Sequence, residues 1–343
     1  MNNLLDKLAT EHSLDLNEYE QLVKSFCPEL ADCASQKAVD QRKLCYGNSV
    51  FIRGLIEISN ICKNDCLYCG IRRSNKTCER YRLTSEEILE CCQNGYELGF
   101  RTFVLQGGED SYFSNEILCQ LITEIKQDYP DCAVTLSLGE RTIESYSLLK
   151  NAGADRYLLR HETADKEHYQ KLHPSDMSFD NRMLCLQNLK KLGYQTGCGF
   201  MVDSPFQTAS TIAKDLKFIE EFRPAMCGIG PFIPAANTPF ADKTAGSVDF
   251  TCYLLSIIRL IHPSILLPAT TALGTLDTRG REKGILAGAN VIMPNLSSAK
   301  SRGKYEIYNG KVYNNDLADD LEQLKANMKA IGYEIVNGRG DAV

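Results

Sequence analysis

The stretch FIRGLIEISNICKNDCLYCG, residues 51–70, passes from an apolar, β-branched segment directly into a loop that carries Cys62, Cys66 and Cys69. The first part, residues 51–59, is typical of a buried strand. Seven further strand candidates follow it: TFVLQ (102–106), AVTLSL (133–138), RYLLR (156–160), TGCGFMV (196–202), CGIGPF (227–232), ILLPAT (265–270) and NVIMP (290–294). A helical stretch or a long connection follows each strand. Eight such units predict a complete (β/α)8 TIM barrel of the α/β class.

The segments that flank these units predict the domain organisation. Residues 1–50 indicate an N-terminal helical extension, with Pro28 suited to a first helical position and Gly47 to a helix stop. The barrel is expected over residues 51–300, and the polar stretch 301–343 is expected to form a C-terminal cap. Because strand boundaries are uncertain by a few residues, an open doubly wound sheet and a six-stranded barrel are alternatives.

The composition excludes several classes of protein. The chain has 343 residues, 43% of them hydrophobic, and a net charge of -6 without a long basic run, which argues against a nucleic-acid partner. We see no apolar run that would span a membrane and no secretory signal, and therefore expect a cytoplasmic protein. The 15 cysteines are scattered and odd in number, which favours a reducing, anaerobic cell over a disulfide framework.

The three cysteines of the first loop have the spacing of an open iron–sulfur site. Cys62, Cys66 and Cys69 follow the pattern CxxxCxxC, so each thiolate can bind one iron of a [4Fe-4S] cluster that usually takes four. The fourth iron can then chelate S-adenosylmethionine (SAM), as in radical SAM enzymes, where reduction of SAM gives a 5′-deoxyadenosyl radical. Tyr68 can pack on the adenine. The alternative is a structural zinc site with Cys78 as fourth ligand, for which the three-residue gap is unusual.

QGGED, residues 106–110, ends the second predicted strand and adds a possible SAM contact. Gly107 and Gly108 permit close approach of another backbone segment, and Glu109 offers a carboxylate. The segment resembles the GGE motif that binds the amino group of SAM, although paired glycines also mark plain turns. Gln106 precedes the glycines and is expected to face the cavity.

RYLLRHE, which ends the fourth predicted strand, carries three charged or polar residues in succession. Strand alternation puts Arg160 and Glu162 on one side and His161 on the other. The first two predict a polar lining for SAM or an anionic substrate, with a structural ion pair as the alternative. Arg182, at the start of a later helix, can bind a carboxylate with two hydrogen bonds, or be a solvated arginine.

Further polar residues point to the mouth of the barrel. Two pairs of hydroxyls lie at predicted strand ends: Thr135 with Ser137, and Thr270 with Thr271. They can bind carboxylates there, or satisfy neighbouring backbone groups, which we favour for either pair alone. Arg53 and Glu57 share one face of the first strand, and form either a buried pair near the cluster or a structural salt bridge.

Several of these segments together resemble one family. The segments are NSVFIRGLIEISNICKNDCLYCGIRRSNK, FVLQGGED, VTLSLGE, ADRYLLRHETA, GIGPFIPAANTP, LPATTALGT and GANVIMPN, between about residues 45 and 310. They look like the HydE family of radical SAM [FeFe]-hydrogenase maturases, whose relatives are biotin synthase and methylornithine synthase. The resemblance implies a full (β/α)8 barrel and a SAM-binding [4Fe-4S] cluster on the three cysteines. It also implies that Ser137, Glu162 and Arg182 contact SAM or a ligand. Thr135, Arg160, Thr270 and Thr271 then line an anion-binding cavity that Tyr305 caps.

The resemblance further implies a function in assembly of the hydrogenase diiron subsite, on an organometallic iron–cysteine species carrying CO and cyanide. Expected partners are an electron donor such as ferredoxin or flavodoxin, and other hydrogenase maturases. The alternative is a related mutase or sulfur-insertion enzyme acting on a small amino-acid-derived substrate, and a non-catalytic iron–sulfur carrier is a third hypothesis. No cysteine follows Cys252, so a second cluster is not expected. The turn MVDSPFQT (201–208) and Leu296 depart from the family pattern near the barrel mouth.

Overall fold

Three helices precede the sheet in a computed structural model, which describes residues 2–310 and 317–342. They are α1 (Asn2–Glu11), α2 (Leu16–Lys24) and α3 (Pro28–Tyr46). Pro28 occupies the first position of α3, and Gly47 ends the helix with a φ of 56°. Helix α3 packs on α10 (Val248–Ile261), and α2 packs on α9 (Ala209–Phe222). The predicted N-terminal helices therefore lie against the outer helices of the α/β region.

Six parallel strands form the main sheet, in the order β2–β3–β4–β5–β6–β8. Their bounds are β2 (Gly54–Ser59), β3 (Thr102–Gly107), β4 (Ala133–Ser137), β5 (Arg156–Leu158), β6 (Gln195–Cys198) and β8 (Met226–Cys227). The first predicted strand divides at Arg53, because β1 (Ser49–Ile52) pairs with β10 (Val291–Ile292) and β11 (Glu334–Val336) instead. The predicted α/β class with a parallel sheet is confirmed.

Shorter pairings involve the remaining predicted strands. The segment 265–270 forms isolated parallel bridges from Leu266 to Met226 and from Pro268 to Val291, and Leu55 bridges to Asn295. Two other predicted strands are divided, which leaves β7 (Met201–Val202) paired with β9 (Gly230–Pro231). Glycine causes the division: Gly199 has a φ of 153°, and a β-carbon there would lie 2.1 Å from the carbonyl oxygen of Gly228.

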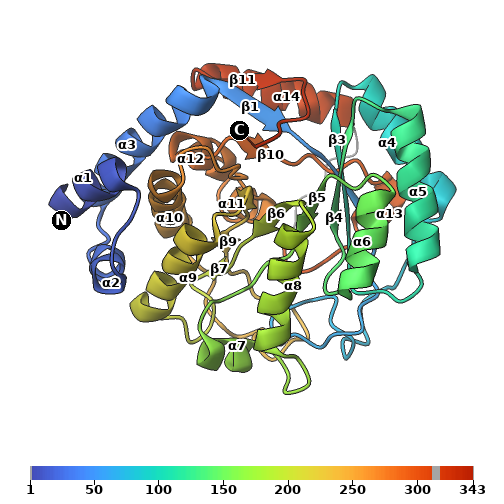
Figure 1. Cartoon of the computed structure of the whole chain (residues 1–343), viewed down its shortest axis with the longest axis horizontal. Coiled ribbons are helices and arrows are strands. Elements are labelled where there is room, and N and C mark those ends of the chain that lie inside the picture. Colours follow the sequence, from blue (N-terminus) through green and yellow to red (C-terminus); the bar gives the residue numbers. More distant parts are fainter. Residues whose placement is uncertain (1, 311–316, 343) are drawn as a thin grey trace.

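Helices surround the strands (Figure 1). Besides those already named, they are α4 (Ser85–Glu97), α5 (Asn115–Asp128), α6 (Ile143–Asn151), α7 (Lys166–Leu172), α8 (Phe179–Lys191), α11 (Thr271–Leu276), α12 (Gly280–Leu286), α13 (Ala299–Arg302) and α14 (Leu317–Ala330). The predicted capping box of α4 is present, since Thr84 accepts the N–H of Glu87 and Glu87 accepts that of Thr84. Within the described ranges, no helix is long and apolar enough to cross a membrane.

The C-terminal segment lies at both ends of the strands rather than over one end only. Tyr305 lines the cavity at the carboxyl ends of the strands. Strand β11 then runs beside β1 (Figure 1), and the tail packs at the amino ends. There, Arg156 donates to Asp341 Oδ1 at 2.6 Å and to the carbonyl oxygen of Arg339 at 2.7 Å. The tail thus covers the amino ends of the strands, which we call the floor of the sheet. The polar sequence of residues 301–343 did not predict this role.

Candidate active site

A cavity of about 330 Å³ opens at the carboxyl ends of the strands. Its wall contains fourteen of the seventeen residues singled out from the sequence: Cys62, Tyr68, Cys69, Gln106, Gly107, Gly108, Glu109, Ser137, Arg160, Glu162, Arg182, Thr270, Thr271 and Tyr305. Only Gln106, Gly107 and Ser137 of this set lie on strands, and most of the others lie in the segments that follow the strands. The carboxyl ends of parallel strands are also where α/β proteins place their ligand sites.

Three of the singled-out residues lie outside the cavity wall. Cys66 lies in the loop beside it, with Sγ 3.7 Å from Met177 Sδ. Thr135 is buried two residues before Ser137 on β4. Arg53, contrary to expectation, lies at the floor, where it donates to Met226 Sδ at 3.2 Å and to the carbonyl oxygen of Gly340 at 3.3 Å. Arg53 precedes Glu57 by four residues, which correspond to about 13 Å of extended chain. Arg53 therefore lies at the floor, whereas Glu57 lies at the cavity.

The cysteine loop and the double-glycine turn are built against each other. Glu109 N–H donates to Cys62 Sγ at 3.3 Å, and Lys63 N–H donates to the carbonyl oxygen of Glu109 at 3.0 Å. A β-carbon on Gly108 would lie 2.2 Å from the carbonyl oxygen of Ile61 and 2.7 Å from Cys62 Cβ. The close approach that the paired glycines predict is therefore an approach to the cysteine loop itself.

Charged residues inside the loop fix its path. Asp65 accepts from Arg72 Nε at 2.8 Å and from the N–H and hydroxyl of Ser74 at 2.9 and 2.7 Å. Arg80 donates to the carbonyl oxygens of Asn60 and Ile71 at 2.6 and 2.8 Å. These residues were not predicted from the sequence, although the charged residues that follow the cysteines were a signal for them.

The thiols lie in an apolar setting that disfavours their charged form. Burial raises the pKa of Cys62 and Cys66, and raises that of Cys69 to about 12. Loss of their protons must therefore accompany metal binding. Among the described residues, no three His, Cys, Asp or Glu side chains converge as ligands of a single ion. The cysteines of a cubane cluster bind different irons and need not converge on one ion.

Arg160 and Glu162 face the cavity with atoms that have no hydrogen-bond partner among the described residues. Arg160 Nη2 lies 3.2 Å from Glu162 Oε2, but both atoms, and Arg160 Nε, are buried without a hydrogen bond. The hydroxyl of Thr270 in the same wall is also unsatisfied. Because such groups carry a desolvation cost, they indicate a polar ligand that completes their hydrogen bonds.

Arg182 reaches the cavity from the first turn of α8. Its Nε donates to Glu140 Oε1 at 2.5 Å, and its Nη1 donates to the carbonyl oxygen of Arg160 at 2.6 Å. The residue is buried, so the alternative of a solvated arginine is wrong. Glu140, which the sequence analysis did not select, follows Gly139, whose φ of 75° turns the chain beside the Glu109 carboxylate.

Tyr68 is oriented by a buried histidine. His173 Nδ1 lies 3.0 Å from the carbonyl oxygen of Tyr169, so Nδ1 must carry the proton. Its Nε2 then accepts from the Tyr68 hydroxyl, 3.2 Å away. Burial, followed by the charge of Arg182, lowers the pKa of His173 to about 3, which keeps the ring neutral. No metal-ligand spacing marked this histidine in the sequence, and only the folded chain reveals its contact.

Comparison with known proteins decides the family. The sequence profile of the Radical SAM superfamily matches residues 56–219. The [FeFe] hydrogenase maturase subunit HydE of Thermotoga maritima is 47% identical over 271 residues, which span 79% of this chain and 77% of that protein. The chain belongs to the HydE family of radical SAM enzymes. The HydE-family resemblance noted in its motifs is therefore confirmed.

More distant relatives of this HydE-family chain share its fold. The 3-methylornithine synthase of Methanosarcina acetivorans is 28% identical, over 96% of this chain and 95% of that protein. A crystal structure of methylornithine synthase (PylB) superposes with a TM-score of 0.85 at 26% identity, and each chain is covered to 97%. A structure of the maturase HydG gives a TM-score of 0.79 at 20% identity, over 98% of this chain and 75% of that one, and shows the fold alone.

Proposed function

We propose that this HydE-family chain reductively cleaves SAM to a 5′-deoxyadenosyl radical during assembly of the [FeFe]-hydrogenase diiron subsite. The observation that carries the proposal is the single cavity that joins the cysteine loop, the double-glycine turn and the Arg160–Glu162 pair. The identity of 47% to a protein named HydE supports the choice of pathway. The substrate is then a small organometallic iron species.

Three residues hold the iron–sulfur cluster: Cys62, Cys66 and Cys69. The cluster and SAM together supply the chemistry, electron transfer and cleavage of the bond between sulfur and C5′. SAM is held by Tyr68, Gly107, Gly108, Glu109, Ser137, Glu162 and Arg182. Glu109 suits an ammonium group, because its carboxylate is oriented by the N–H of Glu140, which it accepts at 3.0 Å, and by Lys63 Nζ, which lies 3.0 Å away.

The deeper wall binds the substrate. Gln106, Arg160, Thr270 and Thr271 present a cation, an amide and hydroxyls, which together suit an anionic or cyanide-bearing ligand. Tyr305 covers this part of the cavity and is itself deeply buried. Buried side chains around the cavity limit the access of water to a reactive radical. Thr135 and Arg53 lie outside the wall and support these residues.

The same proposal extends to the whole fold. We infer that residues 51–300 close into a complete (β/α)8 barrel, with residues 1–50 as extension and 301–343 as cap. The parallel bridges of Leu266 and Pro268 support closure, because they link the seventh strand segment to β8 on one side and to β10 on the other. Strand β10 in turn pairs with β1, which leads into β2.

One cluster per chain and a cytoplasmic setting complete the proposal. With a single site, anaerobic reconstitution should give about four irons per chain, and Cys62→Ala/Cys66→Ala/Cys69→Ala should retain almost none. About eight irons in the wild type, or iron retained by the triple variant, would show a second cluster. Ferredoxin or flavodoxin supplies the electron, and the other hydrogenase maturases are partners. The 15 free cysteines fit a reducing compartment.

The decisive experiment combines turnover with maturation. The reconstituted chain receives dithionite and SAM, and 5′-deoxyadenosine is measured beside Cys66→Ala and the control Cys252→Ala. We expect the product with wild type and control only; its absence from all three would favour an iron–sulfur carrier. Apo-hydrogenase is then matured with this protein as the single variable component. Radical formation without maturation would favour the methylornithine synthase-like or sulfur-insertion alternative.

A further inference from the structure

Glu162 has a strained backbone at the wall of the cavity. Its φ is 64°, in the left-handed region, which is unfavourable for a residue with a β-carbon. Its N–H donates to the carbonyl oxygen of Gly199 at 3.0 Å, and it forms an isolated parallel bridge with Phe200. Strained residues persist only where the surroundings over-determine them, and they concentrate at functional sites. The groups that hold Glu162 therefore matter.

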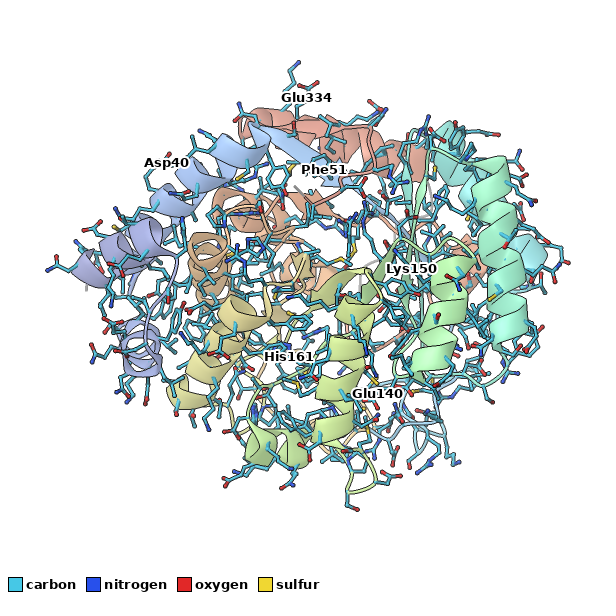
Figure 2. The ribbon with its side chains drawn as sticks, in the orientation of Figure 1. Asp40, Phe51, Glu140, Lys150, His161 and Glu334 are labelled. Atoms are coloured by element: carbon cyan, nitrogen blue, oxygen red, sulfur yellow. The ribbon has the colours of Figure 1, made fainter. Side chains whose placement is uncertain are left out.

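His161, the preceding residue, points away from the cavity and is fully buried. Figure 2 shows it in the interior of the molecule, whereas Asp40 and Glu334 lie at the periphery. The N–H of Gly199 donates to His161 Nδ1 at 3.2 Å, so Nδ1 carries no proton. The proton of the neutral ring is then on Nε2, which lies 3.3 Å from Asp215 Oδ1, slightly misaligned for a hydrogen bond.

Asp215 completes a brace around the strained residue. It comes from α9 and is fully buried, and its Oδ1 accepts the N–H of Ala164 at 2.5 Å. The His161–Asp215 pair is thus attached on one side to Gly199, the partner of Glu162, and on the other to the turn that follows Glu162. Burial of an imidazole and a carboxylate is costly, and neither group reaches the cavity.

We propose that His161 and Asp215 are positioning residues that hold Glu162 in its left-handed conformation, so that its carboxylate faces SAM. The inference rests on the proposed function, because it takes SAM as the ligand of Glu162. The brace acts through Glu162 alone and carries no reacting atom. Its loss weakens SAM binding, while the cysteine loop keeps its cluster.

A double-mutant cycle tests this coupling in the reconstituted protein. SAM affinity is measured from the change that SAM causes in the electron paramagnetic resonance spectrum of the reduced cluster. Because the residues are coupled, Asp215→Ala should weaken SAM binding about tenfold in the wild-type background and less than about twofold in Glu162→Gln. A merely structural role would weaken binding equally in both backgrounds, and that result would overturn the proposal.

Two further variants control for folding. Asn290→Ala removes a fully buried side chain that directly precedes β10 and whose Oδ1 accepts the N–H of Leu267 at 2.9 Å, and it should lower the melting temperature without changing SAM affinity. Asp215→Asn keeps an oxygen that can accept from Ala164 and His161, and should restore SAM affinity. Weakened SAM binding in Asn290→Ala would contradict the proposed role of the brace. So would an Asp215→Asn variant whose SAM affinity is no higher than that of Asp215→Ala. A wild type that holds its cluster but binds no SAM contradicts the proposed function instead.

Discussion

The α-carbon of Gly108 faces the carbonyl oxygen of Ile61, the residue before the first cysteine, so closely that a β-carbon would lie 2.2 Å from that oxygen. The double-glycine turn and the cysteine loop are thus in van der Waals contact, although they are separated in the sequence. Any side chain on Gly108 must therefore displace the cysteine loop.

Gly108→Ala should therefore impair cluster binding. We expect overpacking of about 1–3 kcal/mol, a shifted Cys62 and a clearly lower iron content after anaerobic reconstitution, measured by iron assay and by the absorbance of the cluster. Gly303→Ala is the matched control, because a β-carbon there meets no atom within 4 Å. Equal iron contents in the two variants would refute the contact.

Arg182→Lys should weaken SAM binding. Arginine donates to Glu140 Oε1 and to the carbonyl oxygen of Arg160 at once, whereas lysine has no planar fork with which to hold both. Loss of one charge-assisted hydrogen bond, about 1.5 kcal/mol, corresponds to roughly tenfold weaker binding. Asn181→Ala, which removes a neighbouring, solvent-exposed contact to Glu140, should change SAM affinity less than about twofold. Wild-type affinity in Arg182→Lys would exclude this role.

His173→Phe should destabilise the cluster-free chain at neutral pH. The substitution keeps an aromatic ring beside Tyr169 but removes the acceptor of the Tyr68 hydroxyl. A buried hydroxyl without a partner costs about 1–3 kcal/mol, which urea unfolding measures. Adding Tyr68→Phe should recover part of this loss, since the stranded hydroxyl is then gone. A double variant less stable than His173→Phe would argue against the hydrogen bond.

The same substitution should show a defined pH dependence. In the folded wild type, the pKa of His173 is lowered to about 3, mainly by burial, whereas an unfolded histidine has a pKa of about 6.5. As the pH falls below 6.5, the unfolded wild-type chain gains a proton that the folded chain does not bind, so the wild type loses stability. The difference in the free energy of unfolding between wild type and His173→Phe should therefore be largest above pH 6.5. It should become smaller as the pH falls. A constant difference would show that the pKa of His173 is the same in the folded and unfolded chains.

Asp341→Asn should destabilise the floor of the sheet. Arg156 is fully buried and lies 2.6 Å from the Asp341 carboxylate, so the substitution leaves a buried cation without its anion. Because the Asp341 side chain is partly exposed, we expect a loss of about 1–2 kcal/mol in urea unfolding rather than the full cost of a buried pair. Asp180→Asn breaks an exposed pair with Lys166 and should cost less than about 0.5 kcal/mol. Similar losses in both variants would contradict the role of the tail.

Local signals account for the features that the sequence predicted well. Thr84 and Glu87 form the expected capping box, and Pro28 begins its helix, because these interactions involve residues a few positions apart. The period-two pattern predicted that Arg160 and Glu162 lie together and apart from His161, as they do, although β5 ends at Leu158 and Glu162 has a left-handed backbone. The rule that parallel strands end at one edge then brought the motifs to one cavity.

Where the structure differs from the sequence-based prediction, contacts between residues far apart in the sequence determine the position of the side chain. Arg53 shares a strand face with Glu57, but the tail residue Gly340 holds it at the floor. The sequence of the tail shows only that it is polar. Its packing at the amino ends of the strands depends on the contact between Arg156 and Asp341, which are 185 residues apart. Likewise, no pattern in the sequence joins Tyr68 to His173, 105 residues apart.

The sequence by itself determined the α/β class, the cysteine loop and most members of the cavity wall, because periodicity, capping and ligand spacing are encoded over short distances. Only the tertiary structure decided what orients those residues. The hold of Glu140 on Arg182, of His173 on Tyr68 and of the His161–Asp215 pair around Glu162 each requires two segments to meet in space. Whether they meet depends on how the whole chain packs, and no local pattern carries that information.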